Sequence, residues 1–150
     1  MATVVAVDPG GTTGLALWSP ALGLSMRELS PADQAVDWLA DVLGSGNPKR
    51  SVVVERYIIT PATAKMSQQH DALEIIGAVK FLVRKYGHTL TMQTPAEAKK
   101  FSTDTKLKNV GWYQPGLPHA RDASRHALLY LAKQGIIDLH TLLGGTIEPL

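Results

Sequence analysis

Two patterns of apolar and polar positions alternate along this chain of 150 residues. The first is a short apolar run rich in β-branched residues and bounded by Gly, Pro or polar residues, which is typical of a strand. Five such runs predict strands, at residues 3–7, 14–18, 25–29, 51–54 and 89–94. The fourth run has no polar alternation, which indicates a central strand that is buried on both faces.

The second pattern is a longer segment with apolar residues at helical spacing. Segments of this kind predict helices at residues 31–43, 62–86 and 118–134, and Pro95 begins a shorter one. Ser30 is the expected N-cap of the first helix, with Pro31 as its first residue. Residues 103–118 are polar with Gly and Pro, which predicts a mobile loop or a broken helix. Together these elements predict an α/β fold, a mixed five-stranded sheet flanked by helices.

Three acidic residues stand where an acid is unusual. Asp8 ends the first strand, Glu55 ends the buried fourth strand, and Asp122 lies in the first turn of the last helix. A carboxylate directly after an apolar strand is partly desolvated, and two close carboxylates repel each other unless a cation lies between them. If the first and fourth strands are neighbours, Asp8 and Glu55 come together. His119 is three residues before Asp122, on the same helix face, so the set favours a site for a hard divalent ion such as Mg²⁺.

Each of these residues also has a purely structural interpretation. Asp8 suits a turn, and Glu55 has a neighbouring cation in Arg56. Asp122 suits the dipole at a helix start, and His119 suits a cap or an exposed surface. Only the combination of the four favours a metal site.

Three segments of the sequence resemble one known family. VVAVDPGGTTGLALW, VVVERY and HARDASRHALLYLA, which together span nearly the whole chain, are similar to the catalytic segments of RuvC-like Holliday-junction resolvases. The resemblance implies a ribonuclease H-like fold and a single nuclease domain over residues 1–150. It also implies that Asp8, Glu55, His119 and Asp122 hold two Mg²⁺ or Mn²⁺ ions. A lysine that contacts the scissile phosphate is implied as well, and either Lys106 or Lys108 fits that role.

The activity implied by the resemblance is metal-dependent hydrolysis of phosphodiesters in branched DNA, by a cytoplasmic homodimer of bacterial or phage type. Family members carry an aromatic wedge shortly after the Glu, and the nearest candidate here is Tyr57. The alternatives are a flap, fork or RNA–DNA hybrid nuclease on the same fold, and a nucleic-acid-binding module without catalysis. Because all the carboxylates are present, an enzyme is favoured over the inert module.

Charge and composition narrow these classes further. The net charge is only +2, but residues 98–108 hold four lysines against a single acid, Asp104, and Arg121 and Arg125 follow. The candidates for contacts with nucleic-acid phosphates are Lys99, Lys100, Lys106, Lys108, Arg121 and Arg125. The absence of cysteine excludes thiolate metal sites and disulfides. We also expect no signal peptide and no transmembrane segment.

A few other residues allow both a functional and a structural interpretation. The glycines of residues 10–14 suit a phosphate cradle but are more typical of a hairpin turn. Trp112 and Tyr113 suit stacking on a base or anchoring of the loop. A second apolar line on the helix at 62–86 predicts either deeper burial or the interface of a homodimer. Its members are Met66, Leu73, Gly77 and Phe81.

Overall fold

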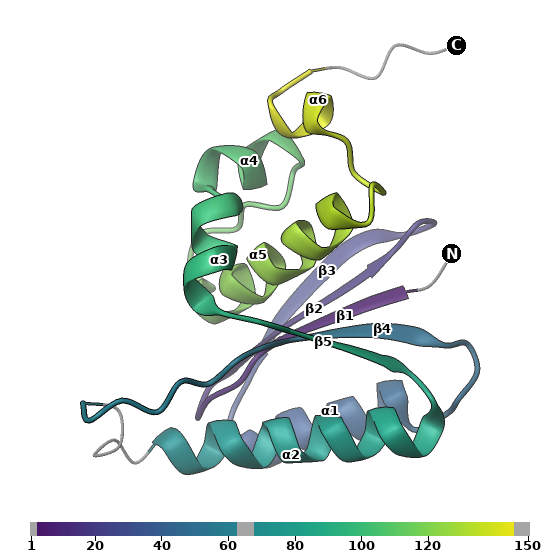
Figure 1. Cartoon of the computed structure of the whole chain (residues 1–150), viewed down its shortest axis with the longest axis vertical. Helices are drawn as coiled ribbons and strands as arrows, with labels where there is room; N and C mark the ends of the chain where they lie inside the picture. Colours follow the sequence, from purple (N-terminus) through teal and green to yellow (C-terminus); the bar gives the residue numbers. More distant parts are fainter. Residues whose placement is uncertain (1–2, 63–67, 146–150) are drawn as a thin grey trace.

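The computed structural model describes residues 3–62 and 68–145, which form a mixed five-stranded sheet with helices on both faces (Figure 1). The strands are β1 Thr3–Asp8, β2 Thr13–Ser19, β3 Gly23–Leu29, β4 Arg50–Glu55 and β5 Thr89–Gln93. The helices are α1 Ala32–Leu43, α2 Gln68–Tyr86, α3 Pro95–Phe101, α4 Asp104–Asn109, α5 Pro118–Lys133 and α6 Leu139–Leu142. All five strands lie where the apolar runs predict them, and the predicted α/β class is confirmed.

The strand order is β3-β2-β1-β4-β5. β1 pairs antiparallel with β2 and parallel with β4, and β5 continues the sheet parallel to β4. The expected adjacency of the first and fourth strands is therefore confirmed. Because neighbouring parallel strands end at the same edge of a sheet, the carboxyl ends of β1 and β4 lie side by side.

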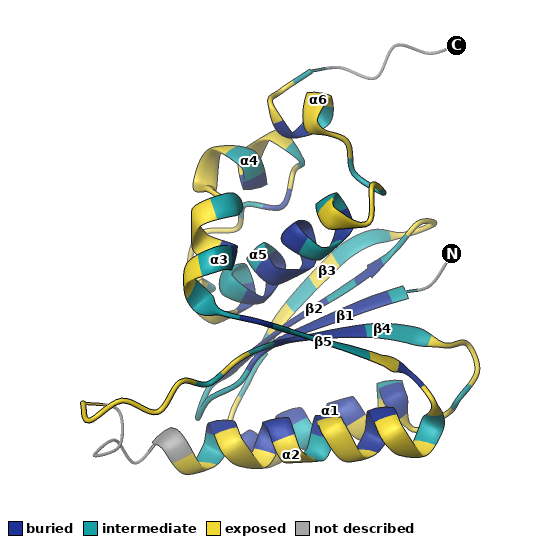
Figure 2. Ribbon diagram, in the orientation of Figure 1, coloured by how far each residue is buried: buried dark blue, intermediate teal, exposed yellow. Residues whose placement is uncertain are grey.

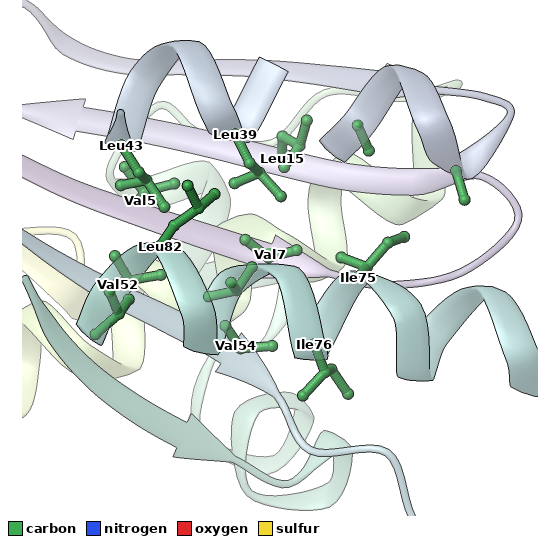
Figure 3. Close-up of a cluster of buried hydrophobic side chains, with 14 residues drawn as sticks. Val5, Val7, Leu15, Leu39, Leu43, Val52, Val54, Ile75, Ile76 and Leu82 are labelled. Carbon is green, nitrogen blue, oxygen red and sulfur yellow. The ribbon is translucent and has the colours of Figure 1, made fainter. Parts of the chain in front are cut away.

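The two faces of the sheet bury separate apolar clusters, which follow from the alternation of side chains along each strand. On one face, α1 and α2 pack against the sheet, and Figure 3 shows Val5, Val7, Val52 and Val54 meeting apolar side chains of both helices. On the other face, α5 crosses the sheet and packs on Val4, Ala6 and Val53, with α4 and α6 beyond it. β1 and β4 are covered on both sides, which is why β4 reads as an unbroken apolar run.

The starts of the first two long helices differ from expectation. Ser30 does not cap α1: Pro31 holds the N-cap position with an extended backbone, and no side chain caps this end. The predicted start of the next helix at residue 62 is also wrong, because residues 61–62 form a turn and α2 begins at Gln68. Among the described side chains of α2, the first buried one is that of Ala72, so the helical spacing of apolar residues could not locate the start of the helix.

The segment 103–118 contains a helix, so of its two predicted forms the broken helix is correct. Thr103 caps α4 by accepting a hydrogen bond from the backbone N–H of Lys106. Leu107 and Trp112 are buried in the cluster beneath α5. Burial of Trp112 favours the anchoring role over stacking on a base. The short helix α6 was not predicted.

Within the part of the chain that the structure describes, no helix is both long enough and apolar enough to cross a membrane.

Candidate active site

One row of residues runs across all five strands on the face of the sheet that α5 covers. Alternation places it there, because Val4, Ala6 and Val53 pack on this face and the residues two positions along each strand share it. The strand register aligns its members side by side. In spatial order they are Glu28 of β3, Gly14 of β2, Asp8 of β1, Glu55 of β4 and Gln93 of β5. We call this set the transverse row.

The first two members of the transverse row, Glu28 and Gly14, position the start of α5. No residue at the start of the helix caps it. Instead, one carboxylate oxygen of Glu28 accepts hydrogen bonds from the backbone N–H groups of His119, at 2.7 Å, and Ala120, at 3.1 Å. A carboxylate at this end also suits the positive end of the helix dipole. Gly14 lets the helix approach, because a Cβ atom on Gly14 would lie 1.9 Å from the carbonyl oxygen of His119. The close approach of α5 thus gives a structural reason for a glycine at position 14, without a role in binding phosphate.

The helix brings three of its side chains to the centre of the row. Nδ1 of His119 lies 3.5 Å from Oδ2 of Asp8. Asp122, one turn further, acts electrostatically on Asp8 and contacts Arg125, with Nε 3.4 Å from Oδ1. His126 follows at helical spacing, and its Nε2 lies 2.8 Å from Oε2 of Glu55. The four residues singled out by the sequence thus lie at one edge of the sheet.

The carboxyl group of Asp8 is the most perturbed group of the site. Burial, the charges of Glu55 and Asp122, and a hydrogen bond with Glu55 raise its pKa from 3.8 to about 8. The charge of Lys99 acts in the opposite direction. At neutral pH and without a cation, the carboxyl group of Asp8 is therefore mostly protonated.

This arrangement fits a divalent metal ion. Within residues 3–62 and 68–145, no three His, Asp or Glu side chains surround a ready-made ion position. The donor set is nevertheless of the right kind, since carboxylate oxygens are the ligands that Mg²⁺ prefers and imidazole is acceptable to Mn²⁺. The raised pKa of Asp8 shows that its carboxylate lacks a compensating positive charge. A cation between Asp8, Glu55 and Asp122 would supply it.

The pKa of Asp8 predicts how folding stability depends on pH. Because the native pKa lies above the unfolded value of 3.8, the native state holds a proton that the unfolded state loses, and stability falls as pH rises from about 4 to about 8. Asp8→Asn should remove this dependence and be more stable than the parent at pH 8 in EDTA, by on the order of several kcal/mol. Thermal melts of both proteins between pH 4 and pH 8.5 measure it. Parallel pH profiles for the two proteins would contradict the assignment.

The basic candidates lie on α3, α4 and α5, and among them Lys99 acts on Asp8 and Arg125 contacts Asp122. Lys99 and Lys100 are exposed in the last turn of α3. Lys106 is less free, because its Nζ donates to the carbonyl of Phe101 and lies over the ring of that residue. Lys99 was predicted only as a phosphate contact, yet its charge is the one that acts on Asp8.

The other three basic candidates, Lys108, Arg121 and Arg125, also contact neighbouring side chains. Lys108 and Arg121 lie over the ring of Tyr113, at 4.7 Å and 5.2 Å from its centroid. Arg125 contacts Asp104 and Asp122, and its guanidinium also donates to the carbonyl of Ser102 at 2.6 Å. Arg125 therefore joins α4 to α5, and it is less available to a ligand than the exposed lysines.

The segment after Glu55 holds Tyr57, the candidate for the aromatic wedge, followed by two isoleucines. Tyr57 is partly buried and packs against the apolar cluster of α1 and α2. The two residues that follow, Ile58 and Ile59, are exposed apolar side chains. Tyr57 therefore contacts the core with part of its side chain, and its role as a wedge stays a prediction.

No protein-family model and no curated protein matches the sequence. Two solved structures do resemble this one. Over 91% of this chain and 98% of the other, RuvC of T. thermophilus in complex with a Holliday junction substrate matches with a TM-score of 0.65 and 18% sequence identity. A second structure of Thermus thermophilus RuvC matches with a TM-score of 0.57 and 21% identity, over 89% and 97% of the two chains. The chain therefore has the ribonuclease H-like fold of RuvC over nearly its whole length.

Proposed function

We propose that this protein is a divalent-metal-dependent endonuclease that hydrolyses phosphodiesters in branched DNA, with the four-way junction as its substrate. The observation that carries the proposal is the convergence of Asp8, Glu55, His119 and Asp122 at one edge of the sheet, where burial and the charges of Glu55 and Asp122 also raise the pKa of Asp8 to about 8. A cluster of unbalanced carboxylates at a sheet edge is costly without a cation, and perturbed carboxyl groups mark functional sites. The likeness to RuvC, solved with a Holliday junction substrate, supports the choice of DNA as ligand.

The side chains of the site have distinct parts in this proposal. Asp8 and Glu55 from the sheet and Asp122 from α5 would hold Mg²⁺ or Mn²⁺, two ions in all, with His119 as a fourth donor. Such ions polarise the phosphodiester and stabilise the attacking and leaving oxygens. If His119 does not bind an ion, its half-exposed side chain beside Asp8 can instead orient a water molecule and accept its proton. Lys99 adds a positive charge at the same edge.

One assay tests the proposal against its alternatives. Four-way junctions, flaps, forks, RNA–DNA hybrids, single strands and linear duplex are incubated with the protein in Mg²⁺, Mn²⁺ or EDTA, and the products are resolved on gels. We expect paired nicks in the junction that depend on the metal. Preference for flaps or hybrids would leave a metal nuclease of another specificity. Binding without cleavage in either metal would contradict the enzyme and leave a binding module.

Removing a phosphate contact should lower the salt dependence of DNA binding. Each contact contributes about 0.9 to the slope of log affinity against log salt on duplex DNA. We therefore expect Lys100→Ala and Lys108→Ala each to reduce the slope by about that amount, and Lys106→Ala to reduce it less because its Nζ is held by Phe101. Lys49→Ala, an exposed lysine at the opposite end of β4 from Glu55, is the matched control. Equal slopes in all four variants would exclude α3 and α4 as the DNA-binding surface.

We propose that α2 forms the interface of a homodimer, since two symmetric nicks call for two sites related by a two-fold axis. The outer face of α2 is exposed in Figure 2, and Leu73 and Phe81 are 42% and 50% exposed along it. A Cβ atom on Gly77, between them, would meet no atom within 4 Å. Met66, the fourth residue of the predicted line, lies outside the described residues.

Placing a charge on this face should separate the subunits. Leu73→Glu should give a folded monomer, because an unpaired carboxylate buried in an interface costs several kcal/mol. This monomer should still nick flaps but lose paired cuts across a junction. Leu22→Glu, which charges an exposed leucine in the turn between β2 and β3, is the control. Sedimentation measures the outcome, and a parent that is already monomeric would exclude the dimer.

A further inference from the structure

Among the carboxylates described at the site, Glu55 is distinguished by a hydrogen bond with a buried histidine, His126. His126 is 1% exposed and lies on α5 seven residues after His119, so both side chains face the sheet. Its Nε2 lies 2.8 Å from Oε2 of Glu55, and its Nδ1 lies 2.8 Å from the amide oxygen Oε1 of Gln93. Gln93 is the last member of the transverse row and is paired with Glu55 across β4 and β5. His126 is not among the candidate site residues that the sequence suggested.

The hydrogen-bonding chemistry sets the direction of this contact. A neutral imidazole carries one proton, and a carboxylate accepts only, so the proton belongs on Nε2 and is donated to Glu55. Nδ1 is then an acceptor, and the NH₂ of Gln93 must be turned toward it. That orientation also gives the amide nitrogen of Gln93 a partner, which it otherwise lacks although it is buried.

We infer that His126 is a positioning residue for Glu55, and that Gln93 orients His126 in turn. The chain Gln93–His126–Glu55 holds Oε2 of Glu55 toward the helix and leaves Oε1 for a metal ion between β1 and β4. The inference deepens the proposed function and rests on it, because Glu55 must act as a ligand. Residues that hydrogen-bond a ligand typically contribute 10- to 100-fold to metal affinity. An apolar residue would fill the same buried space equally well if His126 served packing alone.

Two polar substitutions of His126 separate positioning from packing. In His126→Gln the amide reaches the place of Nε2, so it can still donate to Glu55. In His126→Asn the amide reaches only the place of Nδ1, so it keeps the contact with Gln93 and loses Glu55. The two variants differ by one methylene group, and both keep a polar group in a site that already holds one. His126→Leu removes both contacts.

The readout is the affinity for Mn²⁺, measured by calorimetric titration of the protein without DNA, with thermal melts as a check on folding. We expect His126→Gln to bind Mn²⁺ within about threefold of the parent, and His126→Asn and His126→Leu to bind about tenfold or more weakly. Nicking assays at increasing Mn²⁺ should show the same order in the metal concentration needed for half-maximal rate. Equal Mn²⁺ affinity of the parent, His126→Asn and His126→Gln would overturn the positioning role.

Failure of the proposed function gives a different result in the same titration. A parent that binds no Mn²⁺, or binds it as tightly as Asp8→Asn does, would refute the metal site itself. A parent that binds Mn²⁺ and loses it in Asp8→Asn, but is indifferent to His126→Asn, would refute only the inference about His126.

Discussion

Glu55→Gln is expected to reduce cleavage of junction DNA by on the order of 10³-fold while the protein remains folded. The amide keeps the shape of the side chain and can still accept a hydrogen bond from Nε2 of His126 through its oxygen. What it loses is a full negative charge at the place where a cation is to be held, and electrostatic groups of this kind commonly contribute two to three orders of magnitude each to turnover. Asp8→Asn and Asp122→Asn are expected to have effects of the same order.

Folding and DNA binding distinguish loss of chemistry from loss of structure. The three amide variants should bind junction DNA in EDTA at least as tightly as the parent, because none of them removes a cation or adds a negative charge near the phosphates. Asp37→Asn, the same change on an exposed position of α1 across the sheet, should cleave at the parental rate. Full nuclease activity in Asp8→Asn would refute the assignment of Asp8 as a residue that holds the metal ion.

The parts of the fold and site that the sequence predicts correctly depend on local patterns. β1 and β4 are unbroken apolar runs that each end in an acid, so their burial and their carboxyl ends could be located without a structure. Asp122 and His119 share a helix face by spacing alone. Their approach to the sheet required only that β1 and β4 be neighbours and that α5 cover them.

The parts that could not be predicted depend on contacts between residues far apart in the sequence. Glu28 lies in a strand with only partly buried residues, and nothing local shows that it caps a helix about 90 residues later. His126 looks like an ordinary position of an amphipathic helix until Gln93 and Glu55 are placed around it. The site lysine is a similar case: the resemblance offered Lys106 or Lys108, which stays a prediction, and nothing in the local sequence indicated that the charge of Lys99 acts on Asp8.

The transverse row explains why these distant residues act together. Each member contacts or faces α5 between His119 and His126. The sheet therefore positions the helix, and the helix adds His119, Asp122 and His126 to the site. Glu28 and Gly14 bind its backbone, Asp8 meets the side chain of His119, and Glu55 and Gln93 meet His126. A change anywhere in the row that moves α5 is therefore expected to disturb the site, even if no catalytic side chain is altered.

Gly14→Ala is the strongest test of that expectation. The added methyl group would lie 1.9 Å from the carbonyl oxygen and 2.2 Å from the carbonyl carbon of His119, which are backbone atoms that cannot turn aside. Either β2 or the start of α5 must move by an ångström or more, and overpacking of this kind costs about 1–3 kcal/mol or more of folding stability. The same movement would pull the hydrogen bonds of Glu28 apart and carry His119 and Asp122 away from Asp8.

We expect a folded Gly14→Ala protein to melt at a lower temperature and to cleave about 10²-fold more slowly, since a misplacement of 1 Å at a catalytic group has that effect. Gly11→Ala is the matched control: it adds the same methyl group in the same hairpin, but meets only the end of the Asp71 side chain, at 3.3 Å. The pKa of Asp8 supplies a second readout, because a receding Asp122 raises it less. The pH dependence of stability in EDTA should therefore be shallower in Gly14→Ala than in Gly11→Ala. Parental stability and cleavage in Gly14→Ala would show that α5 does not rest on β2 as described.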